Sequence, residues 1–193
     1  LQKYGSLLRT NAIYSPAEWS AKEAVRLLEE VLSHAPRSPR TQHALARALI
    51  QLAGLKGETG RIGPALGESQ RALGLLHALL DVEDDVPIDP LEIKKDLASV
   101  YNSLGKWLQL DGKLAKSEES YRRALEVLTE LRGSLPGVRD TRESLALCQG
   151  MLGELLRSMG RNDESEPLIT HAIQGLEDLA EDFPQIPRYR RHL

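Results

Sequence analysis

Hydrophobic residues recur along this chain with the spacing of a helix, and prolines interrupt them at regular intervals. Apolar positions three and four residues apart, with polar residues between them, are typical of amphipathic α-helices. Proline lacks the backbone N–H that a helix interior needs, so it stops the pattern. Four prolines mark the interruptions, 51, 49 and 48 residues apart: Pro36, Pro87, Pro136 and Pro184. The chain is therefore predicted to be a series of helices punctuated about every 50 residues.

The stretches between these prolines are similar to one another. Residues 97–144 superpose on residues 145–192 without a gap, at an offset of 48. A shift of 52 relates residues 45–96 to the stretch that begins at Leu97, and a shift of 100 relates the start of the chain to it. Such self-similarity is the signature of a helical repeat array. We predict one all-α solenoid over residues 1–193, with four approximate repeats: 1–44 (truncated), 45–96, 97–144 and 145–192.

Within each repeat the apolar pattern predicts two antiparallel helices joined by a tight turn. In the third repeat the pattern breaks at Asp111-Gly112-Lys113 and then resumes. Three helix starts are marked by a capping residue with a glutamate three positions later, and the capping residues are Ser15, Asp89 and Asp140. A proline directly follows the first two caps, at the helical position that accepts proline best.

The repeats resemble tetratricopeptide repeats (TPRs), whose pattern places large residues, a Leu-Gly pair, a turn glycine and small residues at fixed positions. The third repeat supplies Tyr101, Leu104, Gly105, Leu108, Gly112, Ser117, Tyr121 and Ala124, and the fourth supplies Leu152, Gly153, Leu156, Gly160, Ser165 and Ala172. The second departs from the pattern with Ala53 for the first glycine and Ser69 for the aromatic residue. Small residues let two helices approach closely. The resemblance implies an α-α superhelix of antiparallel hairpins.

The repeats are longer than the roughly 34 residues usual for TPRs. We expect the extra length to extend the second helix, as in residues 118–135, which resembles the long-helix variety of kinesin light chains. The closing residues 179–191 resemble TPR arrays appended to bacterial eukaryotic-like serine/threonine protein kinases. The sequence contains no kinase glycine loop or catalytic loop.

Repeat solenoids usually present long surfaces that bind other proteins. In the TPR family the first helix of each hairpin lines a concave groove, and the resemblance implies these groove-lining residues: Arg47, Gln51, Asn102, Lys106, Gln109 and Glu154. The lysines, asparagines and arginine of the family's carboxylate clamp are not reproduced, which disfavours chaperone tails as ligands. We expect a non-enzymatic scaffold that binds a protein or peptide, as the regulatory or scaffolding region of a bacterial signalling protein. Self-assembly and the non-catalytic part of a serine/threonine kinase are the alternatives.

Composition narrows the partners and the compartment. The formal net charge of −3 gives no chain-wide attraction to nucleic acid. No apolar run reaches the roughly 20 residues that span a bilayer. The single cysteine, Cys148, excludes an internal disulfide and fits a reducing, cytoplasmic compartment. Because the chain opens on Leu1 and ends on Leu193, which aligns with the first residue of a repeat, we expect it to be a piece of a longer protein.

Several residue clusters are candidate chemical sites. The glycines of residues 54–67, with Lys56 and Arg61 among them, match no phosphate-binding fingerprint, so a loosened turn is expected there. The acidic residues 81–85 lack the spacing of a calcium loop and are expected to form a solvated connector. The five histidines are dispersed and offer no zinc-binding pair. No cofactor, metal or catalytic residue is predicted.

Three further features have a structural and a functional interpretation. Cys148 lies in an apolar helix pattern, where a buried thiol is the default and a nucleophile lacks an assignable base. The arginines of residues 188–191 are expected to form one face of a following helix, with an acidic partner as the alternative. Trp107 either packs against the neighbouring repeat or is an exposed anchor for a ligand.

Overall fold

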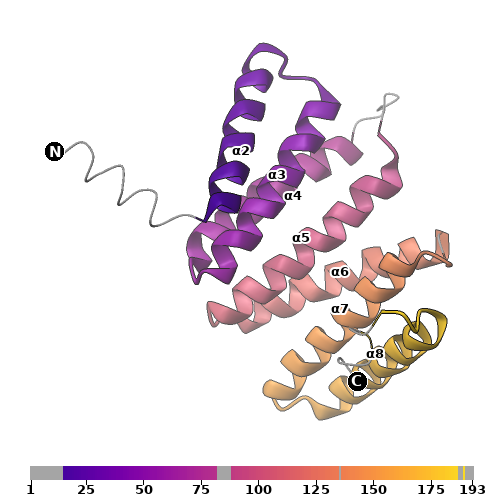
Figure 1. The fold of residues 1–193 in the computed structure, drawn as a ribbon. Helices are drawn as coiled ribbons and strands as arrows, with labels where there is room; N and C mark the ends of the chain where they lie inside the picture. Colours follow the sequence, from indigo (N-terminus) through magenta and orange to yellow (C-terminus); the bar gives the residue numbers. More distant parts are fainter. Residues whose placement is uncertain (1–14, 82–87, 135, 187–188, 190–193) are drawn as a thin grey trace. The chain divides into compact units, whose positions relative to one another are not determined.

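Seven α-helices follow one another in the part of the chain that the computed structural model describes, which comprises residues 15–81, 88–134, 136–186 and 189. They are α2 (Pro16–His34), α3 (Pro39–Glu58), α4 (Ile62–Leu80), α5 (Pro90–Leu110), α6 (Leu114–Ser134), α7 (Arg139–Ser158) and α8 (Asn162–Asp182) (Figure 1). The described residues contain no strand. The all-α class predicted from the sequence is confirmed.

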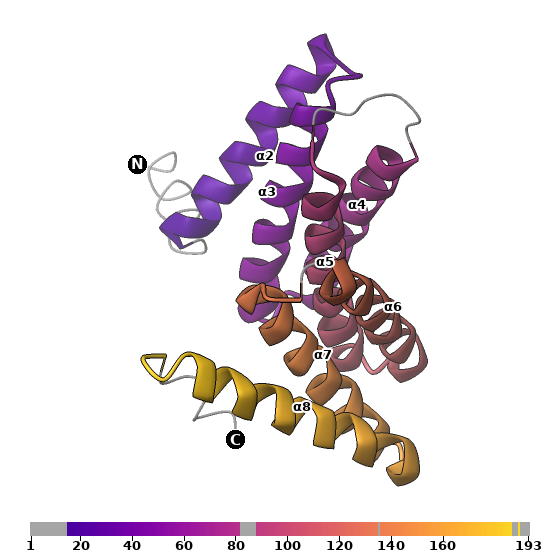
Figure 2. The ribbon, with the colours of Figure 1, turned by 90° about the vertical axis from the view of Figure 1, so that its right-hand side faces the viewer.

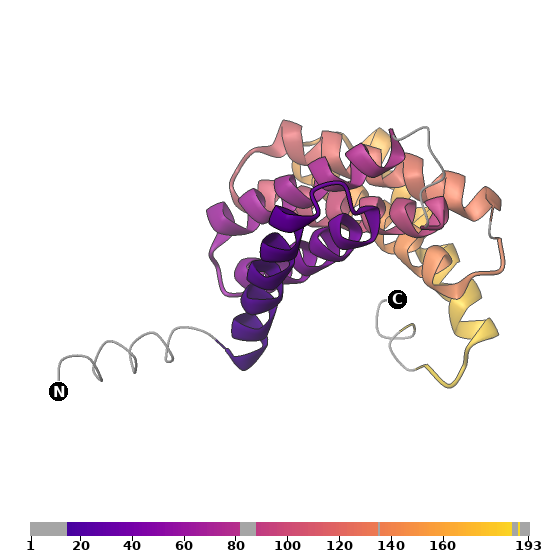
Figure 3. The same ribbon diagram turned by 90° about the horizontal axis from the view of Figure 1, so that it is seen from above.

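The chain divides into two compact units, Leu1–Asp89 and Pro90–Leu193. In the N-terminal unit α2 packs against the α3/α4 hairpin, as Figure 3 shows in indigo and purple. In the C-terminal unit the α5/α6 and α7/α8 hairpins stack mainly through α6 and α7 (Figure 2). The arrangement of all four predicted repeats as a single solenoid stays a prediction.

The three hairpins share one turn, built around a glycine. Gly60, Gly112 and Gly160 have φ angles of +77°, +75° and +79°, a conformation that costs glycine little and other residues more. The residue after each glycine donates its N–H to a carbonyl five positions earlier, as Lys113 does to Leu108 at 2.9 Å. The loosened turn expected in residues 54–67 is therefore wrong, because Gly60 forms the same tight turn as its counterparts.

Helix starts agree with the sequence at two of the three predicted caps. The Ser15 side chain accepts a hydrogen bond from the Glu18 N–H at 3.2 Å, and α5 begins at Pro90 as predicted. The capping box predicted at Asp140 is wrong. Helix α7 already begins at Arg139, because the Val138 carbonyl accepts the Arg142 N–H at 3.2 Å.

The two helices of each C-terminal hairpin touch at a Leu-Gly glycine. A Cβ atom added to Gly105 would lie 2.6 Å from the Tyr121 ring, so no larger residue fits. The buried Ser117 hydroxyl donates to the Gly105 carbonyl at 2.7 Å. Ser165 donates to the Gly153 carbonyl at the same distance in the next hairpin. The small residues predicted to allow close approach do so, and the serine hydrogen bond adds a polar tie that the pattern did not predict.

The core between the hairpins forms around Tyr121, which is 1% exposed. Tyr121 of α6 packs with Leu152, Leu155 and Leu156 of α7. Ala124, 0% exposed, lies beside Leu145 in a neighbouring cluster. Helices α5 and α6 both have 21 residues, so the extra repeat length extends both helices, contrary to the expectation that it extends the second alone.

An ion pair recurs between consecutive repeats. Arg61 pairs with Glu18, and Arg161 pairs with Glu118; the partners are 43 residues apart in both cases. The two pairs are related by the offset of 100 seen in the sequence, so this contact is equivalent in the two units. The corresponding position of the second repeat is Leu66, which cannot form this pair.

Glu118 belongs to a small network of charges. It pairs with Arg161 at 2.6 Å and with Arg122 at 2.8 Å, and both arginines also pair with Glu164. Burial alone would raise the pKa of the Glu118 carboxyl, but the hydrogen bonds from Arg161 and Arg122 outweigh it and lower that pKa. The folded state is therefore stabilised by the ionised form of Glu118.

Replacing Ala124 with phenylalanine is expected to destabilise the C-terminal unit by about 1–3 kcal/mol, because the site has no room for a ring. The measurement is helix melting followed by circular dichroism. Ala115→Phe is the matched control, since Ala115 is exposed on the same helix. Equal melting midpoints for the two variants would show that the register is wrong.

Glu118→Gln is expected to lower stability at pH 7 by roughly 1 kcal/mol or less, the range of partly exposed ion pairs. Because the pKa of Glu118 is lowered by folding, its contribution is complete above the unfolded value of about 4.3 and is lost as pH falls through the folded value. The difference in melting midpoint between wild type and variant should therefore shrink below about pH 4. Glu119→Gln, at an exposed position, is the control; a pH-independent difference would exclude the charge network as the cause.

Candidate functional site

A hollow of about 270 Å³ lies between α5 and α7, the first helices of the two C-terminal hairpins. Leu128 and Leu131 of α6 contribute apolar side chains to it. Its other lining residues are mostly polar: Lys95, Ala98, Ser99, Asn102 and Ser103 of α5, and Asp140, Thr141 and Ser144 of α7. We call this site the α5/α7 hollow.

Asn102 is the one residue predicted to line the groove that reaches this hollow. Its Oδ1 atom is buried and has no hydrogen-bond partner among the described residues. A buried acceptor without a donor costs roughly 1–3 kcal/mol. Asn102 thus lines the hollow and carries an unpaired, buried amide oxygen.

The other predicted groove residues are distributed over three places. Lys106 is exposed farther along α5, with its Nζ 4.7 Å from the centroid of the Trp107 ring, and Gln109 is half-buried one turn later. Glu154 lines a separate hollow of about 360 Å³ between α7 and α8. Arg47 and Gln51 are exposed on α3, in the N-terminal unit.

Sequence reasoning missed most of the polar side chains around Asn102. Lys95 and Ser99 lie at helical spacing before Asn102, so they share a face of α5 with it. That spacing can be read from the sequence. The contribution of Asp140 and Ser144 from α7 cannot be read from the sequence, because it depends on how the two hairpins stack.

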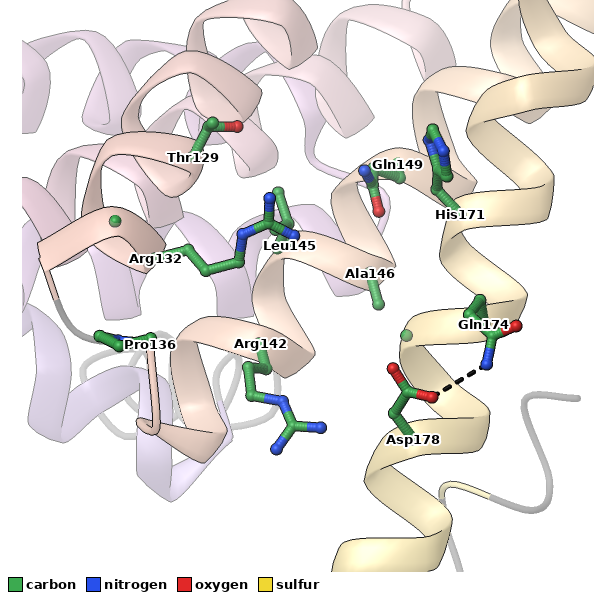
Figure 4. Close-up of a pocket in the computed structure, with 12 residues that line it drawn as sticks. Thr129, Arg132, Pro136, Arg142, Leu145, Ala146, Gln149, His171, Gln174 and Asp178 are labelled. Carbon is green, nitrogen blue, oxygen red and sulfur yellow. Dashed lines mark hydrogen bonds between the residues drawn. The ribbon is translucent and has the colours of Figure 1, made fainter.

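A second, larger groove of about 790 Å³ lies between α6 and α8, with α7 between them (Figure 4). We call it the α6/α8 groove. Helix α7 contributes Arg142, Leu145, Ala146 and Gln149; α6 contributes Thr129, Arg132 and Gly133; α8 contributes His171, Gln174, Gly175 and Asp178. The Gln174 amide donates to the Asp178 carboxylate at 2.9 Å, and Arg142 pairs with Asp182 at 2.6 Å. The sequence did not predict this groove.

The residues considered as a nucleophile, as a ligand anchor and as part of a phosphate cradle occupy structural positions. Cys148 is 0% exposed, its Sγ lies 3.5 Å from the Tyr121 carbonyl oxygen, and burial raises the pKa of its thiol to about 12. Trp107 is 3% exposed, so it is buried and the interpretation as an exposed anchor is wrong. Lys56 pairs with Glu68 at 2.6 Å, so it does not form a phosphate cradle with Arg61.

No group of three or more His, Cys, Asp or Glu side chains suited to a metal ion occurs in the described part of the chain. Within the same residues, no helix combines the length and hydrophobicity that crossing a membrane requires. The arginines of residues 188–191 and the acidic residues 82–85 lie outside the described residues.

Comparison with known proteins finds one family model and several similar solved structures. A model of the tetratricopeptide repeat family matches residues 96–178. No curated protein matches the chain. The solved structure of BtubC (BKLC) from P. vanneervenii is similar with a TM-score of 0.59 and 18% identity, over 84% of this chain and 57% of that one. This likeness shows a shared all-α helical-repeat fold, and the present chain spans 57% of the length of BtubC.

Two other solved structures are more distant. A MamA protein has 17% identity and a TM-score of 0.42, over 84% of this chain and 86% of that one. TTC0263, described as a thermophilic TPR protein of Thermus thermophilus, has 22% identity and a TM-score of 0.27, over 89% and 88%.

Cys148 is expected to resist thiol reagents in the native chain. At pH 8, four units below a pKa of about 12, roughly one thiol in ten thousand is ionised. Reaction with Ellman's reagent should be slow in buffer and complete within minutes in concentrated urea, and the chain has no second cysteine to obscure the signal. Native reaction at the rate of a free cysteine would show that the core around Tyr121 opens readily.

Proposed function

Because the chain carries a tetratricopeptide repeat domain, we propose that it is a non-catalytic scaffold that binds an extended segment of another protein in the α5/α7 hollow. TPR domains in general bind proteins or peptides. The observation that carries the proposal is the buried Oδ1 of Asn102, which has no hydrogen-bond partner among the described residues. A ligand N–H that reaches this atom removes an existing cost and adds a hydrogen bond.

The chemistry of the hollow suits a main chain. A carboxamide accepts through its oxygen and donates through its nitrogen, so Asn102 can bond the N–H and the C=O of one residue in an extended segment, which point to the same side. Those groups are free in an extended segment and internally paired in a helix. Ser99 and Ser103 line the hollow beside Asn102 and add hydroxyl donors and acceptors. A space of about 270 Å³ admits a few atoms of a segment, not a folded domain.

Specificity would come from the residues along α5 beyond the hollow. Lys106 is exposed one helical turn after Asn102 and offers a cation to an acidic side chain of the ligand. Gln109 extends the same face by a further turn. Roles for Glu154, Arg47 and Gln51 in partner binding stay predictions of the repeat register.

We further infer a cytoplasmic role in the regulatory or scaffolding region of a bacterial signalling protein. This inference is supported by the resemblance of residues 179–191 to repeats beside bacterial kinases. Self-assembly is the second candidate function. Light scattering at several concentrations separates the two, because a strictly monomeric chain would remove self-assembly.

Asn102→Ala is expected to weaken peptide binding by roughly 3- to 10-fold without lowering the melting temperature, because it removes a ligand hydrogen bond and an unpaired buried acceptor together. Ligands would be selected from a phage-displayed library of random dodecapeptides on the immobilised chain, then titrated by fluorescence anisotropy. Ser99→Arg, which fills the hollow, should abolish binding of the same peptides.

Glu119→Ala is the control, at an exposed position of α6 outside the hollow. Peptides that bind Asn102→Ala and Ser99→Arg as tightly as wild type would place the binding site elsewhere. A fall in melting temperature for Asn102→Ala would show that the asparagine is a structural residue.

A further inference from the structure

The α6/α8 groove can be compared with the N-terminal unit, because α2, α3 and α4 correspond to α6, α7 and α8 at an offset of 100 residues. The ion pairs described above, Glu18 with Arg61 and Glu118 with Arg161, obey this offset. Buried positions obey it as well, including Leu79 and Leu179, which are 2% and 0% exposed. Each residue of the groove can therefore be compared with its counterpart in the N-terminal unit.

The counterpart groove is bridged. Arg71 of α4 pairs with Glu29 of α2, which ties the two outer helices together across α3. The corresponding residues of the C-terminal unit are His171 and Thr129, and the Thr129 hydroxyl donates to the Leu125 carbonyl at 2.7 Å instead. A threonine and a histidine cannot form the carboxylate–guanidinium bridge that joins α2 and α4.

Smaller and more polar side chains also replace larger apolar ones. Gly175 occupies the position of Leu75, and Gln149, which is half-buried, occupies the position of Leu49, which is 0% exposed. The missing bridge and the missing leucines together account for an open groove of about 790 Å³. An ion pair thus links the two outer helices in one unit, and the equivalent residues of the other unit form no such pair.

The acidic groups of the open groove already have partners, and Arg132 does not pair with any of them. Asp178 already accepts a hydrogen bond from Gln174, and Asp182 already pairs with Arg142. Arg132 is exposed on the α6 wall and has no ion-pair or hydrogen-bond partner among the described residues. Figure 4 shows its side chain extending from α6 toward α7, on the side where Gln149 lies.

We propose that the α6/α8 groove is a second docking surface, for an extended segment of a partner protein that carries an acidic side chain. Its carboxylate pairs with the Arg132 guanidinium, which binds carboxylates in a two-pronged geometry. The Gln149 and Gln174 amides bond to the main chain of the segment. Gly133 and Gly175 on the two walls lack side chains and let that main chain approach closely.

This site is independent of the α5/α7 hollow. Arg142, Leu145 and Gln149 lie at helical spacing on one face of α7, whereas the hollow uses Asp140 and Ser144. The proposal does not rest on peptide binding by Asn102. If both sites are occupied, the C-terminal unit brings two protein segments together on either side of one helix.

The ion pair of the N-terminal unit suggests a double variant that is expected to close the groove. Thr129→Glu combined with His171→Arg transfers the Glu29–Arg71 pair into the C-terminal unit. The bait for selection is the full chain with Ser99→Arg, so that ligands of the α5/α7 hollow do not compete. Random dodecapeptides displayed on phage are selected on it, and the enriched peptides are titrated into the wild-type chain by fluorescence anisotropy.

We expect the enriched peptides to share an aspartate or a glutamate. They should bind Arg132→Ala at least about 10-fold more weakly than wild type, because this is the scale of a hydrogen bond to a charged group. They should also lose affinity for the double variant Thr129→Glu with His171→Arg. Arg123→Ala, which removes an exposed arginine of the same helix outside the groove, should bind like wild type. Melting curves show that each variant is folded; if the double variant is not, Arg132→Ala and Arg132→Glu decide.

Three results would overturn the proposal. One is the absence of enriched peptides, and another is equal affinity of the acidic peptides for wild type, Arg132→Ala and the closed variant. The third is a wild-type chain that dimerises in light scattering while the closed variant stays monomeric, because the groove would then be occupied by a second copy of this chain.

Discussion

The close contact between the two helices of each hairpin is the constraint on which the C-terminal unit depends. At Gly105 the Tyr121 ring occupies the space of the missing side chain, and the Ser117 hydroxyl ties α6 to the Gly105 carbonyl at 2.7 Å. The Tyr121 ring then packs against Leu152 and Leu155 of α7. The glycine therefore determines both the spacing within a hairpin and the surface on which the next hairpin stacks.

The contacts within and between the hairpins place few demands on the residues at the surface, which can differ between equivalent positions. Several buried positions match at the offset of 100 residues, such as Leu79 and Leu179, whereas the positions between α6 and α8 differ from those between α2 and α4. Arg71 and Glu29 link α4 to α2, whereas Thr129 and His171 do not link α6 to α8, where the groove lies. Surface positions can differ between repeats in this way because each repeat contacts only its neighbours.

The sequence predicted the hairpins well because their determinants are local. A glycine at positive φ, a proline after a capping serine and apolar residues at helical spacing act within a few residues of one another. The prediction of a helix cap at Asp140 was wrong because helix starts also depend on backbone hydrogen bonds. The Val138 carbonyl accepts a helical hydrogen bond before Asp140 is reached, and a pattern of residue types does not reveal which backbone carbonyl starts a helix.

The sequence alone determined the helical class, the repeat register and the glycines that the turns require, since these follow from periodicity and from the conformational freedom of single residues. Only the tertiary structure decided which polar residues share a site. Asn102 of α5 and Ser144 of α7 are far apart in sequence and line one hollow because Tyr121 sets how the hairpins stack. The groove around Arg132 likewise exists because two helices that are not neighbours in sequence lie on either side of α7 without a bridge.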